Sequence, residues 1–146
     1  MTWIELVVFA CGTLGTPNLA GNIESVAKDY GIEKTLILSV VVKESTCRPN
    51  ALGTSGDTGL MQIVPKWHQD RIIELSVEDL FDPVQNLTVG SDYLSSLGVD
   101  KDPRRALVIY NGGYSPPPVS YSYADSVLRR KTNYDKLLGG EADEEI

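Results

Sequence analysis

The sequence of 146 residues has few of the side chains on which many enzyme sites depend. His68 is its only histidine, so a histidine metal cluster or a Ser-His-Asp triad has little to draw on. It contains no Cys-x-x-Cys pair and no glycine-rich phosphate loop. No apolar run approaches the roughly 18 residues that a membrane span needs. We therefore expect no metal, no cofactor and no membrane span.

Positive charge is also scarce, with 13 Lys and Arg against 20 Asp and Glu. The net charge is −7; the last six residues hold four acidic and no basic side chains, which leaves −3 for residues 1–138. Nucleic acids are bound by basic surfaces, so this balance argues against a nucleic-acid partner. Hydrophobic residues make up 42% of a chain about one domain long, and a single globular domain is expected.

The two cysteines, Cys11 and Cys47, permit at most one disulfide. A chain of this size has enough core to fold without a covalent link. A lone buried cysteine behaves as a small apolar side chain. A free pair is therefore favoured over a bridge, and the redox compartment stays open.

Three regions are expected along the chain. Residues 1–21 form an N-terminal apolar segment, with a first helix near 3–11 packed on the domain, and they lack the basic start and the length of a secretory signal. Residues 22–138 form the domain itself. Residues 139–146 form an acidic tail that is expected to fray, because it follows Gly139-Gly140 and has no packing role.

Apolar periodicity and capping residues predict an all-α domain. Asn22 is expected to cap a helix that Gly31 ends in the left-handed conformation. Asp82-Pro83 and Asp102-Pro103 each combine an N-cap with proline at the first helical position. The run 35–44 has enough β-branched residues for a buried strand, but no second strand of similar strength exists to pair with it. The predicted helices after the first are 23–30, 35–44, 83–97, 103–110 and 119–131.

Glu44 is the side chain that most suggests catalysis. It follows the most apolar stretch of the chain and precedes a polar loop with several glycines, so a buried helix should open into a cleft there. Burial raises the pKa of a carboxyl group and favours the neutral form that a general acid needs at neutral pH. The alternative is an ordinary helix-end glutamate paired with Lys43 or Arg48.

Four ordered motifs over residues 22–130 make the sequence resemble the catalytic domain of SLT-type lytic transglycosylases, which are relatives of goose-type lysozyme. Gln62 follows Glu44 by 18 residues, which is the spacing of the family's first two motifs. The motifs are, in order, Glu44-Ser45 with Gly59-Leu60-Met61-Gln62, Asp79–Pro83 with Asn86 and Gly90, Arg105-Ala106-Leu107 with Tyr110-Asn111-Gly112-Gly113, and Tyr123 in a last helix.

The resemblance implies a lysozyme-like all-α fold with a cleft. It also implies cleavage of peptidoglycan strands between N-acetylmuramic acid and N-acetylglucosamine, with a 1,6-anhydro product. Glu44 matches the single catalytic acid and base. The residues expected to bind substrate are Ser45, Ser55, Met61, Gln62, Tyr110, Asn111 and Tyr123, although Met61 and Tyr110 can also be read as packing residues.

Two positions depart from the family pattern. Gly53 stands nine residues after Glu44, where the family usually has a serine, and Thr54 or Ser55 is a candidate substitute. Cys47 stands where an aromatic residue is usual, which further favours a buried thiol over a bridge. The missing serine leaves room for a second reading, in which the chain is a catalytically weak wall-docking component.

A lysozyme that uses water is the third reading. Glycosidases usually employ two carboxylates, whereas a transglycosylase needs one, because the substrate's own C6 hydroxyl is the nucleophile. Asp57 is the nearby candidate for the second carboxylate, and its position before Thr58-Gly59 favours a turn-forming role.

Aromatic residues and cellular location complete the expectations. Four tyrosines follow the third motif, where they can stack on sugars or pack in the core, and His68 beside Trp67 is read as a surface or packing residue. The four tyrosines are Tyr114, Tyr121, Tyr123 and Tyr134.

Action in the periplasm or cell wall follows from the substrate. Delivery in a phage virion or by a secretion machine is expected because no convincing export signal is present.

Overall fold

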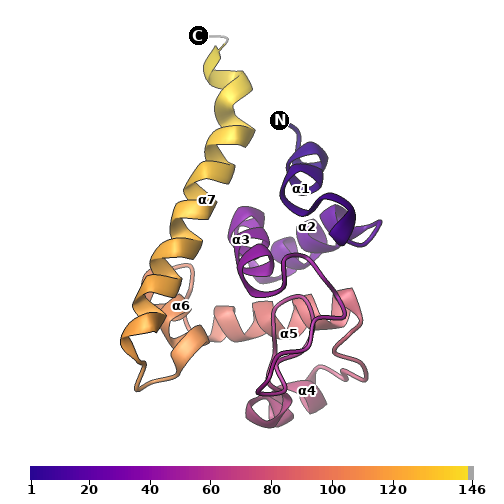
Figure 1. The fold of residues 1–146 in the computed structure, drawn as a ribbon, viewed down its shortest axis with the longest axis vertical. Coiled ribbons are helices and arrows are strands. Elements are labelled where there is room, and N and C mark those ends of the chain that lie inside the picture. Colours follow the sequence, from indigo (N-terminus) through magenta and orange to yellow (C-terminus); the bar gives the residue numbers. More distant parts are fainter. Residues whose placement is uncertain (145–146) are drawn as a thin grey trace.

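The computed structural model describes the backbone of residues 1–144 and the side chains of residues 1–139. Over this part of the chain the regular structure is helical, which confirms the all-α prediction (Figure 1). No helix among the described residues is both long and apolar enough to cross a membrane. The elements are α1 (Trp3–Cys11), η1 (Gly12–Leu14), α2 (Leu19–Tyr30), α3 (Lys34–Ser45), η2 (Pro65–Trp67), α4 (Gln69–Glu74), α5 (Pro83–Ser96), α6 (Pro103–Gly112) and α7 (Pro118–Glu144).

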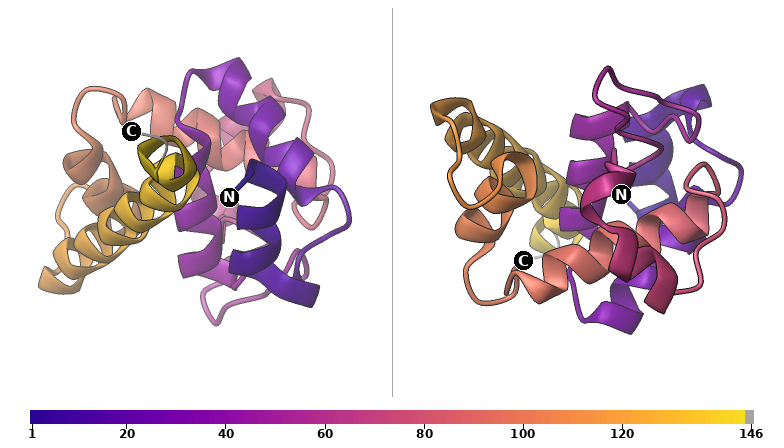
Figure 2. Two further views of the ribbon diagram at one scale, coloured as in Figure 1. Left: turned by 90° about the horizontal axis from the view of Figure 1, so that it is seen from above. Right: turned by 90° about the horizontal axis from the view of Figure 1, so that it is seen from below.

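Helix α3 lies in the middle of the molecule, and it packs against α1, α2 and α7 (Figures 1 and 2). A helix that is apolar on all sides must be covered on all sides. Surrounding helices therefore explain why the run 35–44 is a helix despite its β-branched residues. Its buried apolar side chains are Leu36, Ile37, Leu38, Val40 and Val41, none of which is more than 4% exposed.

Helix α2 begins earlier than the sequence predicted. Its N-cap is Asn18, and Asn22 lies inside the first turn, where its side chain accepts a hydrogen bond from the Asn18 amide at 3.3 Å. The early start has a packing reason, because Leu19 is 1% exposed and extends the buried face one turn before Ile23. The predicted end is confirmed, since Gly31 has φ 64° and closes the helix in the left-handed conformation.

The two Asp-Pro pairs open helices as predicted. The Asp82 carboxylate accepts a hydrogen bond from the backbone N–H of Gln85 at 2.9 Å, and Pro83 is the first residue of α5. The Asp102 carboxylate accepts from the N–H of Arg105 at 3.1 Å, at the start of α6. These caps set where both helices start.

A buried amide on α5 helps to hold the segment between α3 and η2, residues 46–64. Asn86 on α5 is fully buried, and its side chain makes three hydrogen bonds of 2.8 Å. Its oxygen accepts from the N–H of Met61, and its nitrogen donates to the carbonyls of Thr58 and Leu80. Because every polar atom of this amide is satisfied, it fixes the segment firmly against α5.

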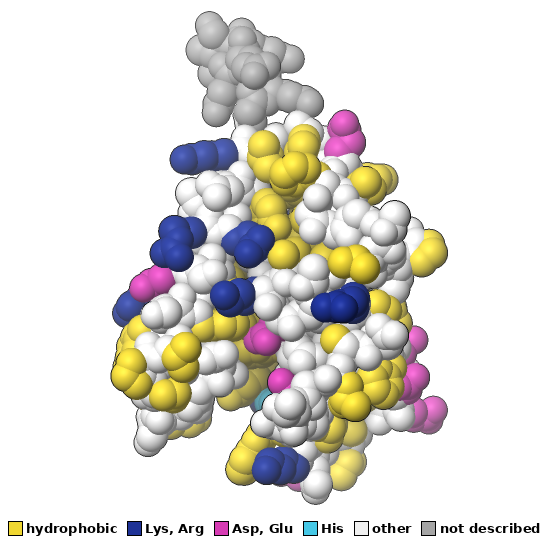
Figure 3. Space-filling view, in the orientation of Figure 1, with side chains coloured by type: hydrophobic (Ala, Val, Ile, Leu, Met, Phe, Trp, Pro, Cys, Tyr) yellow, Lys and Arg dark blue, Asp and Glu magenta, His cyan; other side chains and the backbone are white. Residues whose placement is uncertain are grey.

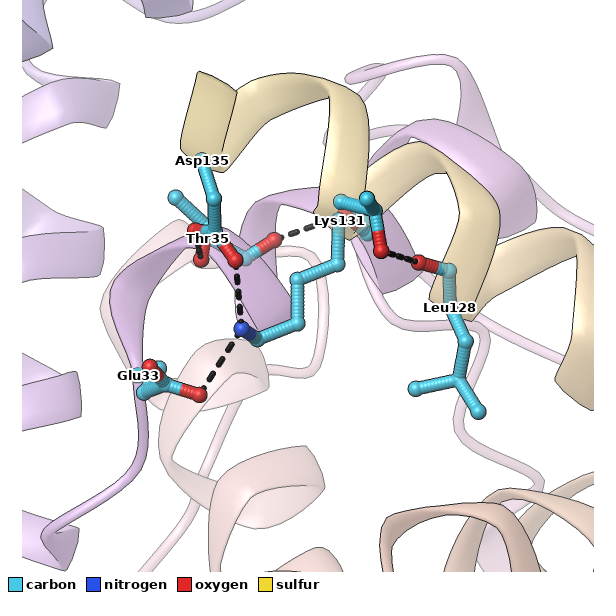
Figure 4. Close-up of polar contacts among 7 residues, drawn as sticks. Glu33, Thr35, Leu128, Lys131 and Asp135 are labelled. Carbon is cyan, nitrogen blue, oxygen red and sulfur yellow. Dashed lines mark hydrogen bonds and ion pairs between the residues drawn. The ribbon is translucent and has the colours of Figure 1, made fainter. Parts of the chain in front are cut away.

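Helix α7 is longer than the predicted 119–131, and polar contacts attach it to the start of α3 (Figure 4). The Lys131 ammonium pairs with Glu33 at 2.8 Å and with Asp135 at 2.7 Å. The Thr35 hydroxyl donates to Asp135 at 2.6 Å. The expected acidic tail, residues 139–146, falls on the last turns of α7 and on residues 145 and 146, which lie outside the described residues.

The structure corrects the prediction of two free cysteines. Cys11 and Cys47 form a disulfide, with their Cα atoms 5.5 Å apart. The expectation that Cys47 is a buried packing residue is correct, since it is fully buried. However, the surface against which it packs is α1, whose inner face also buries Trp3 and Leu6 in the common core. Pairing thus depends on the tertiary position of α1, which a separation of 36 residues does not reveal.

We expect the disulfide to contribute substantially to stability, because it closes a loop of 36 residues that includes the whole of α2 and α3. The double variant Cys11→Ala with Cys47→Ala should lose about 2–4 kcal/mol of unfolding free energy. Urea denaturation measures this loss, and peptide mapping without reduction detects the linked peptides in the unmodified chain. An unchanged unfolding midpoint in the double variant would contradict the expectation.

Candidate active site

A cavity of about 660 Å³ opens beside the C-terminal end of α3. Figure 3 shows a hollow between two lobes on one face of the molecule, with acidic side chains and the single histidine visible inside it. Residues from α3, segment 46–64, η2, α5, α6 and the loop before α7 meet there. The lining residues are Glu44, Asp57, Gln62, Ile63, Val64, Trp67, His68, Tyr93, Ile109, Tyr110, Asn111, Gly112, Gly113 and Pro117.

Glu44 lies in the last turn of α3, where the buried helix meets this cavity. Burial is the main cause that raises the pKa of its carboxyl group to about 7, and the negative charge of Asp57 raises it further. A hydrogen bond from Tyr123 and the charge of Lys43 act in the opposite direction. The predicted desolvation is thus confirmed, and near neutral pH a large fraction of Glu44 is protonated.

Two tyrosine hydroxyls near Glu44 donate hydrogen bonds to different acceptors. The Tyr123 hydroxyl, on α7, donates a hydrogen bond of 2.8 Å to Glu44 Oε2. The Tyr110 hydroxyl, on α6, donates instead to the Met61 carbonyl at 2.7 Å. Tyr123, and not Tyr110, is therefore the phenol that orients the glutamate. Arg48, one of the two alternative partners, donates to the carbonyl of Ser45.

Two amide side chains that the sequence selected lie in the cavity wall. Gln62 has φ 53°, and its side-chain nitrogen donates to the carbonyls of Ala51 at 3.2 Å and Gly59 at 3.0 Å. Asn111 is exposed at the end of α6, and its side-chain oxygen accepts from the Ser120 hydroxyl at 2.8 Å. Both amides are thus oriented by the protein and present polar atoms to the cavity.

Four other residues expected to bind substrate do not line this cavity, namely Ser45, Ser55, Met61 and Tyr123, and Tyr123 lines a neighbouring cavity with Glu44 and Asn111. Met61 is fully buried and fills the space left by Gly90 on α5, so it belongs to the core. Ser45 is 4% exposed, and its hydroxyl donates to the Val41 carbonyl within α3. Ser55 is exposed and is not among the residues that line the cavity.

The aromatic side chains of the cavity are mostly not those that the sequence selected. Trp67 is 72% exposed and lines the cavity, beside His68 and Tyr93, whose ring centroids are 4.6 Å apart. Burial lowers the pKa of His68, so its ring is neutral at pH 7. The only sequence signal for these residues was the adjacent Trp67-His68 pair soon after Gln62. Among the predicted tyrosines, Tyr134 is in the core, and Tyr114 and Tyr121 line a separate cavity.

Asp57 occupies space that exists only because residue 53 is glycine. A Cβ atom added to Gly53 would lie 2.5 Å from Asp57 Cγ, closer than two such atoms can approach. Asp57 Oδ1 accepts from the Ser55 N–H at 3.1 Å, and the Asp57 carbonyl accepts from the Gly53 N–H at 2.8 Å. The predicted turn role is therefore present, and the same side chain also lines the cavity with Glu44.

Within the described residues no group of three or more His, Cys, Asp or Glu side chains could hold a metal ion. What the cavity does contain is one carboxyl group that is partly protonated at pH 7, one further carboxylate, two oriented amides and an exposed indole. This set can donate and accept a proton at one atom and can bind a polar ligand that has a flat apolar face.

Comparison with known proteins agrees with this geometry. The model of the transglycosylase SLT domain family matches residues 21–127, and the chain belongs to this family. In fold it is similar to an inactive variant of the lytic transglycosylase Slt from Pseudomonas aeruginosa, with a TM-score of 0.71 and 21% identity over 82% of this chain. The 70 kDa soluble lytic transglycosylase Slt70 from Escherichia coli matches with a TM-score of 0.71 and 19% identity, also over 82%. The chain spans about a quarter of the length of each, since it covers 24% of both.

Two conservative variants should move the pKa of Glu44 in opposite directions. Asp57→Asn removes the neighbouring negative charge and should lower the pKa below about 7, whereas Tyr123→Phe removes a hydrogen bond to the carboxylate and should raise it. Carboxyl NMR titration of the labelled glutamate measures both shifts. Shifts of the same sign in the two variants would contradict the assigned causes.

Glu44→Gln should stabilise the fold in a pH-dependent way. The pKa of Glu44 is about 7 in the folded chain and 4.5 for the unperturbed group, so ionisation above pH 4.5 favours the unfolded state. The variant cannot ionise, and at pH 8 it should be more stable than the parent chain by about 1–3 kcal/mol. Thermal unfolding at pH 4 and pH 8 tests this, because the difference should disappear at pH 4.

Proposed function

We propose that this chain is a lytic transglycosylase that cleaves the β-1,4 bond between N-acetylmuramic acid and N-acetylglucosamine in peptidoglycan. One observation carries the proposal. Glu44 has a pKa of about 7 at the wall of a cavity that also presents amides and an exposed indole. Family membership and the fold support the same conclusion. The substrate places its action outside the cytoplasmic membrane, in the periplasm or cell wall.

In the first step protonated Glu44 donates its proton to the glycosidic oxygen, and the bond from that oxygen to C1 of the muramic acid breaks. The carbonyl oxygen of the 2-acetamido group forms a bond to C1 as the alcohol leaves. In the second step the C6 hydroxyl attacks C1, the acetamido oxygen departs, and the hydroxyl proton passes to Glu44. The product has a 1,6-anhydro ring, and the glutamate regains its starting proton.

A single carboxyl group suffices for the proton transfers of this sequence because the nucleophile belongs to the substrate. An intramolecular hydroxyl has a very high effective concentration, so no protein group is needed to activate water. The pKa of about 7 suits a residue that must donate a proton and then accept one. Tyr123 donates to the ionised form at 2.8 Å and keeps the carboxyl group oriented between the two steps.

The remaining cavity residues are suited to binding a strand of amino sugars. Gln62 and Asn111 are held by hydrogen bonds to the protein and offer polar atoms to hydroxyl and acetamido groups. Trp67 provides an exposed flat face against which a sugar ring can stack. We expect the strand to lie between Trp67 on one side and the loop after α6 on the other.

The products from purified sacculi test the proposal. The parent chain should release muropeptides one water lighter than hydrolysis products and without a reducible end, as mass spectrometry before and after borohydride reduction shows. Glu44→Gln should lose at least about 10²-fold of this activity, because it removes the proton that is transferred. Its unfolding transition provides the control for folding.

Two outcomes would contradict the proposal in different ways. Reducible muramic acid ends from the parent chain would identify a lysozyme-type hydrolase on the same fold. Binding to sacculi without release of any fragment would identify a wall-docking component.

A further inference from the structure

Gly53 is required for space and not for backbone conformation. The left-handed glycines of this chain include Gly56 and Gly59, but Gly53 is not among them. Its φ therefore lies outside the left-handed region that favours glycine. What a side chain would meet at Gly53 is the carboxylate of Asp57, with Cγ and Oδ2 both at 2.5 Å from the added Cβ. The missing side chain of Gly53 thus leaves the space that the Asp57 carboxylate occupies.

The position of Asp57 in this space is held from two sides by backbone groups. The N–H of Ser55 donates to Oδ1, and the N–H of Gly53 donates to the Asp57 carbonyl. Within residues 1–139 no hydrogen bond from the protein reaches Oδ2. The side chain is half-buried in the wall of the cavity that contains Glu44. One carboxylate oxygen is therefore committed to the turn, and the other can accept from a ligand.

The proposed reaction places positive charge in this cavity. When the acetamido oxygen bonds to C1, the amide of the sugar becomes a cation and its N–H becomes a stronger donor. A fixed carboxylate that accepts from this N–H stabilises the charged species more than the neutral substrate, which lowers the barrier. Asp57 and Glu44 line one cavity, and the charge of Asp57 is felt at Glu44. This places the carboxylate near the reacting groups.

We propose that Asp57 is a second catalytic residue, which accepts a hydrogen bond from the acetamido N–H of the sugar that is cleaved. It stays ionised, neither gains nor loses a proton, and pairs with the cationic intermediate until the C6 hydroxyl attacks C1. This inference rests on the proposed function, and it changes neither the nucleophile nor the 1,6-anhydro product.

The test compares Asp57→Asn with Asp79→Asn. Both aspartates accept a backbone N–H through Oδ1, from Ser55 at 3.1 Å and from Phe81 at 2.9 Å, and only Asp57 lines the cavity. Asparagine keeps the Oδ1 acceptor of each turn and removes the charge. At the pH optimum of each chain, Asp57→Asn should lower kcat by about 10²–10³-fold with KM changed by less than about threefold. Asp79→Asn should match the parent chain.

A second variant, Gly53→Ser, displaces the carboxylate of Asp57 without changing residue 57. Its side chain must displace Asp57, so kcat should fall as it does for Asp57→Asn, whereas the anhydro product should persist in whatever is released. If Gly53→Ser or Asp57→Asn retains kcat within about threefold of the parent chain, the inference is wrong. It is also wrong if the parent chain incorporates labelled oxygen from water into muramic acid ends and Asp57→Asn stops this, because Asp57 would then be a water-activating base.

Failure of the inference and failure of the proposed function give different results. If the parent chain releases no fragments, the proposed function fails. If the parent chain releases anhydro products and both variants do so equally well, the proposed function stands and the role of Asp57 is refuted.

Discussion

The desolvation of one carboxyl group is the constraint on which the rest of this structure depends. A glutamate at the end of a mostly buried helix has a pKa near 7 only if water is kept from it. Helices α1, α2 and α7 enclose α3 and keep the apolar side chains before Glu44 dry. The same enclosure brings Tyr123 of α7 within 2.8 Å of the carboxylate. The packing of helices around α3 therefore determines both the position and the protonation of the Glu44 carboxyl group.

The cavity wall opposite α3 has little regular structure, so other contacts must hold it. Segment 46–64 contains only isolated β-bridges, and the buried Asn86 amide binds it to α5. The disulfide holds the beginning of the segment to α1, three residues after Glu44. These two anchors restrict the segment on both sides of the turn at Gly53–Asp57. A loop held in this way keeps its polar groups in place without a sheet beneath it.

The contacts of Gly53 connect two positions that are separate in the sequence. A missing side chain at residue 53 and a carboxylate at residue 57 are separate features along the chain, yet they share the same volume. A carboxylate differs from a hydroxyl because it only accepts hydrogen bonds and carries charge. The charge of Asp57 contributes to the electrostatics of the cavity, because it raises the pKa of Glu44.

Local sequence determined much of this protein. The apolar run before Glu44, the Asp-Pro starts of α5 and α6, and the glycine after α2 follow from side-chain chemistry within one or two helical turns. The family resemblance selected Glu44, Gln62, Tyr110 and Asn111, and all four line one cavity. Such features are local, or belong to motifs shared by a family, so they can be predicted without coordinates.

Tertiary structure alone decided the features that depend on distant segments. These were the pairing of Cys11 with Cys47, the burial of Met61 against Gly90, and the exposure of Trp67 at the cavity. It also decided that Tyr123 is the partner of Glu44, although 79 residues separate them. The physical reason is the same in each case. Which atoms share a volume depends on how helices pack, and a residue's neighbours along the chain carry no information about that.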